Sequence, residues 1–148
     1  MRMTAKSTKT PLLIDHILKG TTKIAIGLDP LASVIVIEEL SRYDPALTLS
    51  YLAHEVLFVH NFYYNSTPDQ RDRFLPQVLN GECIAAMAMS EPGAGTDVLG
   101  MRTRAIPDGD DYILNGSKQW ITNGEVAGLF LVYARTGDSP RDISAFIV

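Results

Sequence analysis

Cysteine is almost absent from this chain of 148 residues, which contains only Cys83. A single thiol excludes an intrachain disulfide and a metal site built from several thiolates, and it is typical of a reducing compartment. Histidine is also scarce, with three residues. His54 and His60 share one apolar segment without a regularly spaced third ligand. We interpret them as packing or pocket residues and predict no metal site.

An excess of positive charge and long apolar runs are missing as well. The formal net charge is −4 and the pI is near 5.3, so the chain lacks the basic surface that neutralises phosphates along DNA or RNA. Its longest apolar runs, 31–37 and 129–134, are far shorter than the ~20 residues of a membrane helix. A hydrophobic content of 46% is enough for a core. We predict a globular protein with no nucleic-acid partner and no membrane span.

Acidic residues are rare at the start of the chain, where Asp15 is the one acid before Asp29. The basic residues there are Arg2, Lys6, Lys9, Lys19 and Lys23. Organelle transit peptides share this bias, but so does any basic terminus, and we favour the second interpretation. Pro11–Lys19, followed by Gly20, has the pattern of a short helix.

Helical patterns continue to about residue 81. One helix is predicted from Leu31 to the Tyr43-Asp44-Pro45 break, because a residue before proline is disfavoured in a helix. A largely apolar helix is predicted from Ala46 to about Tyr64. Thr67-Pro68-Asp69-Gln70 combines a hydroxyl cap, an early proline and a glutamine three residues after the cap. It predicts a further helix that ends near Gly81.

The second half changes to β-type segments separated by turn clusters. The segments are Cys83–Met89, Met101–Ile106, Tyr112–Asn115, Leu129–Ala134 and Ile143–Val148. Helices followed by strands, without βαβ alternation, predict an α+β fold. We expect a basic N-terminal segment (1–30), a helical domain (31–81) and the first strands of an antiparallel β-domain (82–148).

Two loops are candidate ligand sites, Met87–Asp97 and Asn115–Gly124, and the second contains the only tryptophan. Exposed amides and the Thr96 hydroxyl of the first loop can bind a phosphate or a thioester oxygen. The loop lacks both the Gly-Lys-Ser/Thr end of a Walker loop and the third glycine of a dinucleotide fingerprint. Taken alone it is also compatible with an ordinary tight turn. We interpret the two loops as halves of one cofactor wall.

Several strings in this order resemble the acyl-CoA dehydrogenase family of flavoproteins, over about Leu31 to Val148. They are Glu38-Glu39-Leu40-Ser41-Arg42, Arg73-Phe74-Leu75-Pro76 with Gly81-Glu82, Ala88-Met89-Ser90-Glu91-Pro92-Gly93-Ala94-Gly95-Thr96-Asp97, and Tyr112-Ile113-Leu114-Asn115-Gly116-Ser117-Lys118-Gln119-Trp120-Ile121-Thr122-Asn123-Gly124. The third string and the start of the fourth also look like isovaleryl-CoA dehydrogenases, but they line the cofactor and do not specify the acyl chain.

The resemblance implies an FAD site. In such enzymes the segment matching Met87–Thr96 runs along FAD, with the Ser90 position bonded to the flavin and the Thr96 position near the pyrophosphate and the acyl-CoA. The trio matching Trp120-Ile121-Thr122 meets the isoalloxazine ring, with the last hydroxyl near N5. The implied cofactor-binding residues are Met87, Met89, Ser90, Gly95, Thr96, Trp120, Ile121 and Thr122, and the implied substrate-binding residues are Thr96 and Arg141.

Simpler interpretations exist for several of these residues. A lone tryptophan such as Trp120 is most often a core residue. Ser90 and Thr122 alone are ordinary strand hydroxyls, and Arg141 in a turn is more often a solvated cation than a phosphate ligand. Glu91 lies beside a proline, and the base of the family lies elsewhere, so we interpret Glu91 as structural.

Family members continue past the strand that matches 143–148 and add a C-terminal helical bundle with the catalytic glutamate, more FAD contacts and the tetramer interface. We therefore expect no catalytic residue in this chain, an incomplete middle β-domain without that bundle, and a fragment or short gene product that is inactive alone.

For the complete enzyme, the resemblance implies α,β-dehydrogenation of an acyl-CoA thioester to a 2-enoyl-CoA, with FAD as cofactor. The implied partners are the acyl-CoA substrate, electron-transfer flavoprotein and further copies of the chain. The implied compartment is the mitochondrial matrix in a eukaryote or the cytoplasm in a bacterium. The alternative is a non-catalytic module that binds a partner or complements a second polypeptide.

Overall fold

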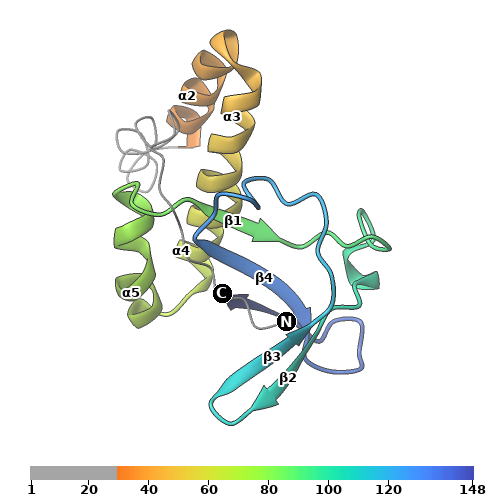
Figure 1. Cartoon of the computed structure of the whole chain (residues 1–148). Coiled ribbons are helices and arrows are strands. Elements are labelled where there is room, and N and C mark those ends of the chain that lie inside the picture. The colour runs from red at the N-terminus through yellow and green to blue at the C-terminus, as the bar shows by residue number, and fades with distance from the viewer. Residues whose placement is uncertain (1–29) are drawn as a thin grey trace.

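The structure is a computed structural model that describes residues 30–148. The short helix predicted over Pro11–Lys19 and nearly all of the basic N-terminal segment lie outside the described residues. The helices come first and the strands follow, so the predicted α+β class is confirmed (Figure 1). The elements are α2 (Pro30–Tyr43), α3 (Pro45–Leu52), η1 (Ala53–His60), α4 (Asn61–Asn65), α5 (Pro68–Leu79), β1 (Ala85–Ala88), η2 (Val98–Gly100), β2 (Arg104–Asp108), β3 (Asp111–Asn115), β4 (Leu129–Arg135) and β5 (Ile143–Ile147).

Two helix starts are capped by side chains, and the sequence predicted one of these caps, that of Thr67 on α5. Asp44 lies between α2 and α3, and its carboxylate accepts hydrogen bonds from the amides of residues 46 and 47. Thr67 caps α5 by accepting from the Gln70 amide, while the Gln70 side chain accepts from the Thr67 amide. Both bonds satisfy amides that have no partner inside the helix. The predicted break at residues 43–45 and the predicted start of α5 are confirmed.

The apolar helix predicted from Ala46 to Tyr64 is not uniform. Its middle part, η1, is a π-helix between the α-helical segments α3 and α4. Side-chain periodicity does not distinguish a π-helix from an α-helix over so few residues, so this change could not be predicted from the sequence. Inside η1, the His54 Nδ1 accepts a hydrogen bond from the Ala85 amide over 3.0 Å, which fixes the helix to β1.

The sheet is mixed. The pairs β2–β3 and β4–β5 are antiparallel, as predicted, but β1 runs parallel to β4, with Ala85 opposite Leu129 and Ala88 opposite Val132. A parallel bridge also joins Arg104 of β2 to Arg135 of β4. The expectation of a wholly antiparallel domain is thus corrected. The β2–β3 hairpin lies between β1 and β4 along the chain, and the chain crosses back over the sheet before β4 begins. The strand β4 therefore runs in the same direction as β1.

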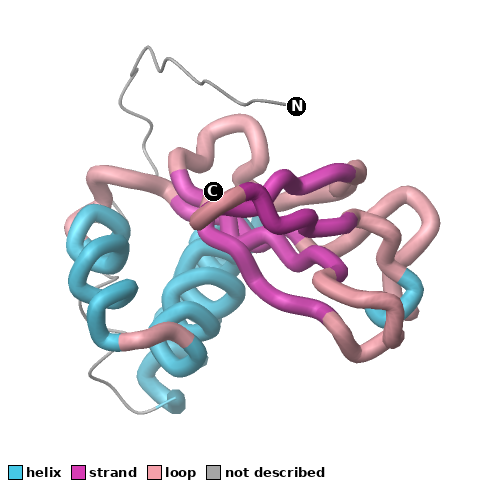
Figure 2. The backbone as a smooth tube through the Cα atoms, turned by 90° about the horizontal axis from the view of Figure 1, so that it is seen from below, coloured by secondary structure: helices cyan, strands magenta, loops and turns pink. Residues whose placement is uncertain are grey.

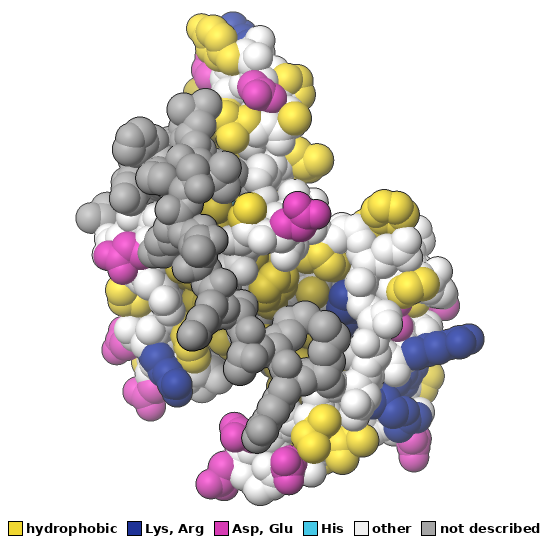
Figure 3. All heavy atoms as spheres, in the orientation of Figure 1, with side chains coloured by type: hydrophobic (Ala, Val, Ile, Leu, Met, Phe, Trp, Pro, Cys, Tyr) yellow, Lys and Arg dark blue, Asp and Glu magenta, His cyan; other side chains and the backbone are white. Residues whose placement is uncertain are grey.

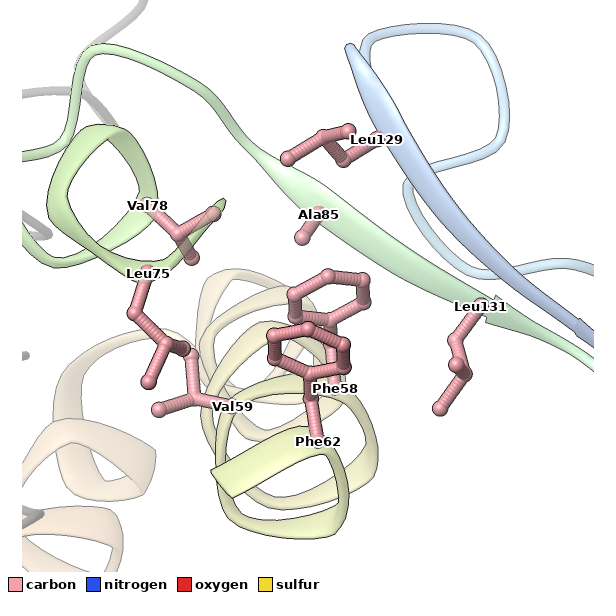
Figure 4. Packing of buried hydrophobic residues seen from close by; sticks show 8 residues of the cluster. All are labelled: Phe58, Val59, Phe62, Leu75, Val78, Ala85, Leu129 and Leu131. Atoms are coloured by element: carbon pink, nitrogen blue, oxygen red, sulfur yellow. The ribbon is translucent and has the colours of Figure 1, made fainter. Parts of the chain in front are cut away.

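The helical elements α2 to α5 gather on one side of the sheet (Figure 2), and the buried core lies between these helices and the strands. Figure 4 shows the aromatic rings of Phe58 and Phe62 between α5 and the strands β1 and β4. Their ring centroids are 5.7 Å apart in a stacked arrangement. The buried cluster consists of Phe58, Val59, Phe62, Leu75, Val78, Ala85, Leu129 and Leu131. This packing fixes η1 relative to β1, and both elements border the site described next. No helix within residues 30–148 combines the length and the apolarity needed to cross a membrane.

Candidate functional site

The two loops singled out in the sequence lie side by side. The Gln119 amide donates a hydrogen bond to the Ser90 carbonyl over 2.9 Å. The Lys118 ammonium donates to the Met89 carbonyl, also over 2.9 Å. These bonds join the end of β1 to the segment that follows β3, so the loops form one continuous wall. What this wall binds stays a prediction at this point.

Glu91 connects the wall to the start of β2. Its carboxylate accepts hydrogen bonds from the Arg102 amide over 2.6 Å, the Thr103 amide over 2.9 Å and the Lys118 ammonium over 2.8 Å. Burial by itself raises the pKa of Glu91, but these hydrogen bonds outweigh it and lower the pKa to about 2. Glu91 is therefore ionised at neutral pH and engaged in holding the wall. This agrees with a structural role and not with that of a catalytic base.

A small pocket of about 100 Å³ lies where the wall meets η1. Two of its lining residues, Ala53 and Leu57, come from η1. The other six all belong to the predicted cofactor set: Met87, Met89, Ser90, Trp120, Ile121 and Thr122. Residues that are some thirty positions apart in the sequence thus border one hollow with apolar walls and two hydroxyls.

Trp120 is not a core residue. It lies in an irregular segment, 85% of its surface is exposed, and its backbone has a φ of +59°. A positive φ is unusual for a bulky residue and persists only where the surroundings hold it. An exposed indole beside a pocket is a typical surface for a planar ligand. The core interpretation of this tryptophan is therefore wrong.

The segment after Trp120 is fixed to the helical layer. Ser50 in α3 donates its hydroxyl hydrogen bond to the Asn123 side-chain oxygen. The Asn123 amide group donates to the Ser50 carbonyl over 3.0 Å. Asn123 itself has a φ of +66°, a conformation that asparagine tolerates better than most residues. This reciprocal pair links positions that are 73 residues apart in the sequence.

Three predicted residues lie outside the pocket. Gly95 and Thr96 are exposed in the loop between β1 and η2, and Arg141 is exposed in the turn between β4 and β5. No atom lies within 4 Å of the place that a Cβ on Gly95 would occupy, so this part of the loop borders open space. The structure therefore divides the predicted set into a pocket group of six and an outer group of three.

Arg135 joins the two exposed segments that carry the outer group. Its guanidinium donates to the Leu99 carbonyl over 2.7 Å and to the Ser139 carbonyl over 2.8 Å, and its Nε donates to the Met101 carbonyl over 2.8 Å. The loop that follows Thr96 and the turn that contains Arg141 are thus held to one side chain of β4. Sequence reasoning missed this residue, because its partners lie in two segments that are about 40 residues apart in the sequence.

The two histidines singled out in the sequence lie on η1 and belong to the packing. His54 is fully buried, and burial lowers its pKa from 6.5 to about 4, against a smaller raising effect of the Val78 backbone. The His60 Nε2 lies 3.2 Å from the Glu55 Oε1. Across residues 30–148, no three His, Cys, Asp or Glu side chains are placed to hold a metal ion.

Comparison with known proteins gives the family. Residues 24–82 match the acyl-CoA dehydrogenase N-terminal domain, and residues 86–148 match the acyl-CoA dehydrogenase middle domain. The chain belongs to the acyl-CoA dehydrogenase family. It is 46% identical over 126 residues to the mitochondrial isovaleryl-CoA dehydrogenase of Pongo abelii, a match that covers 82% of this chain and 30% of that relative.

Solved structures of the family show the same fold. A chain in a structure of the electron transferring flavoprotein of Acidaminococcus fermentans is 34% identical, with a TM-score of 0.86, over 92% of this chain and 38% of that one. A glutaryl-CoA dehydrogenase of Mycobacterium smegmatis in complex with FADH2 is 29% identical, with a TM-score of 0.80, over 90% and 37%. The chain thus spans about a third of the length of these acyl-CoA dehydrogenase relatives and neighbours.

Besides Arg135, sequence reasoning missed four residues in this acyl-CoA dehydrogenase part, two in the pocket and two that hold its wall. Ala53 and Leu57 give only a spacing of four in an apolar helix, which any buried face also shows. Lys118 is 12% exposed in the structure, but a lysine in a loop is usually solvated, so the sequence does not reveal its partners. The Asn123-Gly124 pair indicates a turn in the sequence, but it does not reveal the partner of Asn123 in α3.

Proposed function

We propose that this chain provides the flavin-facing half of an acyl-CoA dehydrogenase. The reaction of the complete enzyme is the α,β-dehydrogenation of an acyl-CoA thioester to a 2-enoyl-CoA with FAD as hydride acceptor. One observation carries the proposal: six residues expected to contact the flavin, from two separate loops, border one pocket with an exposed indole beside it.

The residues around the pocket are compatible with an isoalloxazine ring. Methionine and isoleucine side chains and the Trp120 indole offer an apolar surface to a planar ring, and the Ser90 and Thr122 hydroxyls offer hydrogen bonds to its polar edge. A related glutaryl-CoA dehydrogenase is known in complex with FADH2. In the proposed complex these side chains bind and orient the ring, and FAD supplies the redox chemistry.

The outer group, Gly95, Thr96 and Arg141, is proposed to contact the pyrophosphate of FAD and the acyl-CoA. The exposed loop with Gly95 and Thr96 can approach the pyrophosphate of FAD and the acyl-CoA closely, and Arg141 offers a cation to a CoA phosphate. The pocket residues include no carboxylate or imidazole that could accept the α proton. The carboxylate of Glu91 is held by three donors and its pKa is lowered, which makes it a poor base. We propose that the base comes from another polypeptide segment and that these 148 residues are inactive alone.

The proposed partners follow from the family. Electron-transfer flavoprotein would accept the electrons of the complete enzyme, in keeping with the similarity to a chain from such a flavoprotein structure. Copies of the same chain would form an oligomer. The proposed compartment is the mitochondrial matrix if the source is eukaryotic, as the name of the Pongo abelii relative suggests, and the cytoplasm if it is bacterial. The proposed domain boundary lies near Gly81.

Flavin spectroscopy of the purified chain tests the proposal. We expect a shifted FAD absorption spectrum on titration and no acyl-CoA-dependent reduction of an electron-accepting dye. Ser90→Ala removes a pocket hydroxyl and should weaken FAD binding, whereas Ser144→Ala removes an exposed hydroxyl in β5 and should not. Robust turnover by the chain alone, or an FAD spectrum that is the same with and without protein, contradicts the proposal.

A non-catalytic complementation module is the second candidate. The elements α2, α3 and η1 expose several large apolar side chains: Val34, Ile35, Leu49 and Val56 are 36–57% exposed. Figure 3 shows apolar side chains, in yellow, over the helices at its top. Apolar patches of this kind often mark surfaces that another protein covers. Supplying a polypeptide with the C-terminal half of a family member distinguishes the candidates. Turnover that appears on mixing supports an enzyme half, and binding without turnover supports the module.

A further inference from the structure

The segment Trp120–Thr122 is held at both of its ends. On the side that precedes it, Lys118 and Gln119 bond to the loop after β1. On the side that follows it, Asn123 exchanges two hydrogen bonds with Ser50 in α3. The first set fixes the segment to the sheet, and the second fixes it to the helical layer. The pocket lies between these two attachments.

Ser50 is well placed to set the width of the pocket. It lies one turn before Ala53, which lines the pocket, and its carbonyl also accepts a hydrogen bond from the Ala53 amide at the start of η1. The bond from Asn123 therefore ends at the point where the helix changes from α to π. Any displacement of Asn123 changes the distance between Trp120–Thr122 and the η1 residues across the pocket.

We propose that Asn123, together with Ser50, is a positioning residue that holds Trp120–Thr122 opposite η1 at the spacing that the flavin ring needs. This inference rests on the proposed function only for the identity of the ligand. The attachment itself is a property of the chain without a ligand. Asn123 acts through its neighbours and is not assigned any contact with the flavin.

A simpler explanation is that asparagine is present only because residue 123 needs a positive φ. Asn123→Gly separates the two explanations, since glycine adopts this φ readily but has no side chain to bond Ser50. Ser50→Ala removes the hydroxyl donor and leaves residue 123 unchanged. Ser50→Thr keeps a hydroxyl and serves as the conservative rescue. Ser41→Ala is the matched control, because the Ser41 hydroxyl bonds a helix carbonyl in α2 over 2.7 Å, away from the pocket.

Trp120 reports on the attachment directly, since it is the only tryptophan of the chain. Time-resolved fluorescence anisotropy of the ligand-free protein measures its motion. We expect Asn123→Gly and Ser50→Ala to lose anisotropy through a larger sub-nanosecond component, and the wild type, Ser50→Thr and Ser41→Ala to keep it. Thermal unfolding verifies that each variant is folded, and Ser50→Ala carries the test if Asn123→Gly is not. Unchanged anisotropy in a folded Asn123→Gly or Ser50→Ala protein overturns the proposal.

Titration with FAD completes the test. In Asn123→Gly the binding of FAD must order Trp120–Thr122 without the two hydrogen bonds that order it in the wild type, so we expect about tenfold weaker FAD binding, with wild-type affinity for Ser41→Ala. Equal FAD affinity in a variant that has lost anisotropy overturns the positioning role. If the wild type binds no FAD, the proposed function fails, while the anisotropy result still decides whether the attachment exists.

Discussion

Two buried glutamates in this chain have opposite surroundings. Glu91, at the wall, is 8% exposed and accepts hydrogen bonds from two amides and a lysine, and its pKa is lowered to about 2. Glu55, in η1, is fully buried, and neither of its carboxylate oxygens accepts a hydrogen bond within the described part of the chain. Burial raises the pKa of Glu55 to about 7. Burial alone thus does not decide the charge of a carboxyl group, and the supply of donors does.

The comparison also separates two kinds of region. Around Glu91 three donors hold the carboxylate, and the result is a wall that joins two loops to the start of β2. Around Glu55 no donor hydrogen-bonds the carboxylate within the described residues, and the His60 Nε2 lies 3.2 Å from its Oε1. Ionisation of this buried carboxyl lowers stability near neutral pH. The predictions that follow alter one region at a time.

Removal of the Lys118 charge should have the largest effect. Lys118→Met leaves Glu91 buried without its cation, and breaking such a buried pair costs about 3 kcal/mol of the free energy of unfolding. Urea unfolding of the single and double variants with Glu91→Gln measures this in a double-mutant cycle. The double variant should recover part of the loss. Additive losses would contradict a direct coupling between the two side chains.

Glu55→Gln should increase the free energy of unfolding, whereas Lys118→Met decreases it. The folded-state pKa of Glu55 is raised from 4.5 to about 7 by burial. The unfolded chain therefore releases this proton first, and stability is lost as the pH rises from 4.5 to 7. We expect the variant to keep this stability and to exceed the wild type by about 2–3 kcal/mol at pH 8. Chemical unfolding at a series of pH values checks this, and equal profiles for both proteins would exclude a buried ionising Glu55.

His54 should make stability fall as the pH decreases, the opposite of the effect of Glu55. Its folded-state pKa is lowered from 6.5 to about 4, so its contribution is fully present above pH 6.5 and is lost as the pH falls through 4. In the wild type this slope opposes that of Glu55 between pH 4.5 and 6.5, which flattens the profile. In Glu55→Gln the loss toward acid should become visible. A flat profile of that variant from pH 7 to 4 would contradict the burial of a neutral imidazole.

The smallest loss of stability is expected at Thr67, whose hydroxyl is hydrogen-bonded but not buried. Thr67→Ala removes the side-chain cap of α5 and should destabilise the protein by about 1 kcal/mol. Thermal unfolding measures this loss. Ser144→Ala, an exposed hydroxyl in β5, is the control and should leave the midpoint unchanged. A loss as large as that of Lys118→Met would mean that burial has little part in the contrast between the two regions.

Local chemistry made some elements predictable from the sequence. The Thr67–Gln70 capping box and the helix break at residues 43–45 depend on residues within three positions of each other, and both are present in the structure. The two loops were found because their composition is unusual over a short stretch. These signals involve only neighbours along the chain, so one sequence is enough to detect them.

Other features depend on partners that only the fold brings together. The π-helical part of the long helix and the parallel pairing of β1 with β4 leave no mark on local periodicity. Ala53 borders the pocket because η1 packs on β1, and Arg135 bonds three carbonyls from distant segments. The choice of partner in such cases is made by tertiary packing, which overrides any pattern in a short window.

The pairing of β1 with β4 also sets the order in which the site can form. Residues 85 and 129 are opposite each other in the register, and the whole β2–β3 hairpin lies between them. Closing so long a loop costs conformational entropy, and the contacts between β1 and β4 offset this cost only once several of them have formed. During synthesis β1 cannot take its place in the sheet before β4 has left the ribosome, so the wall, which begins at the end of β1, is fixed to the sheet late. A ligand that bridges both loops would act on folding as well as on the finished protein, because it can bind only after this late step.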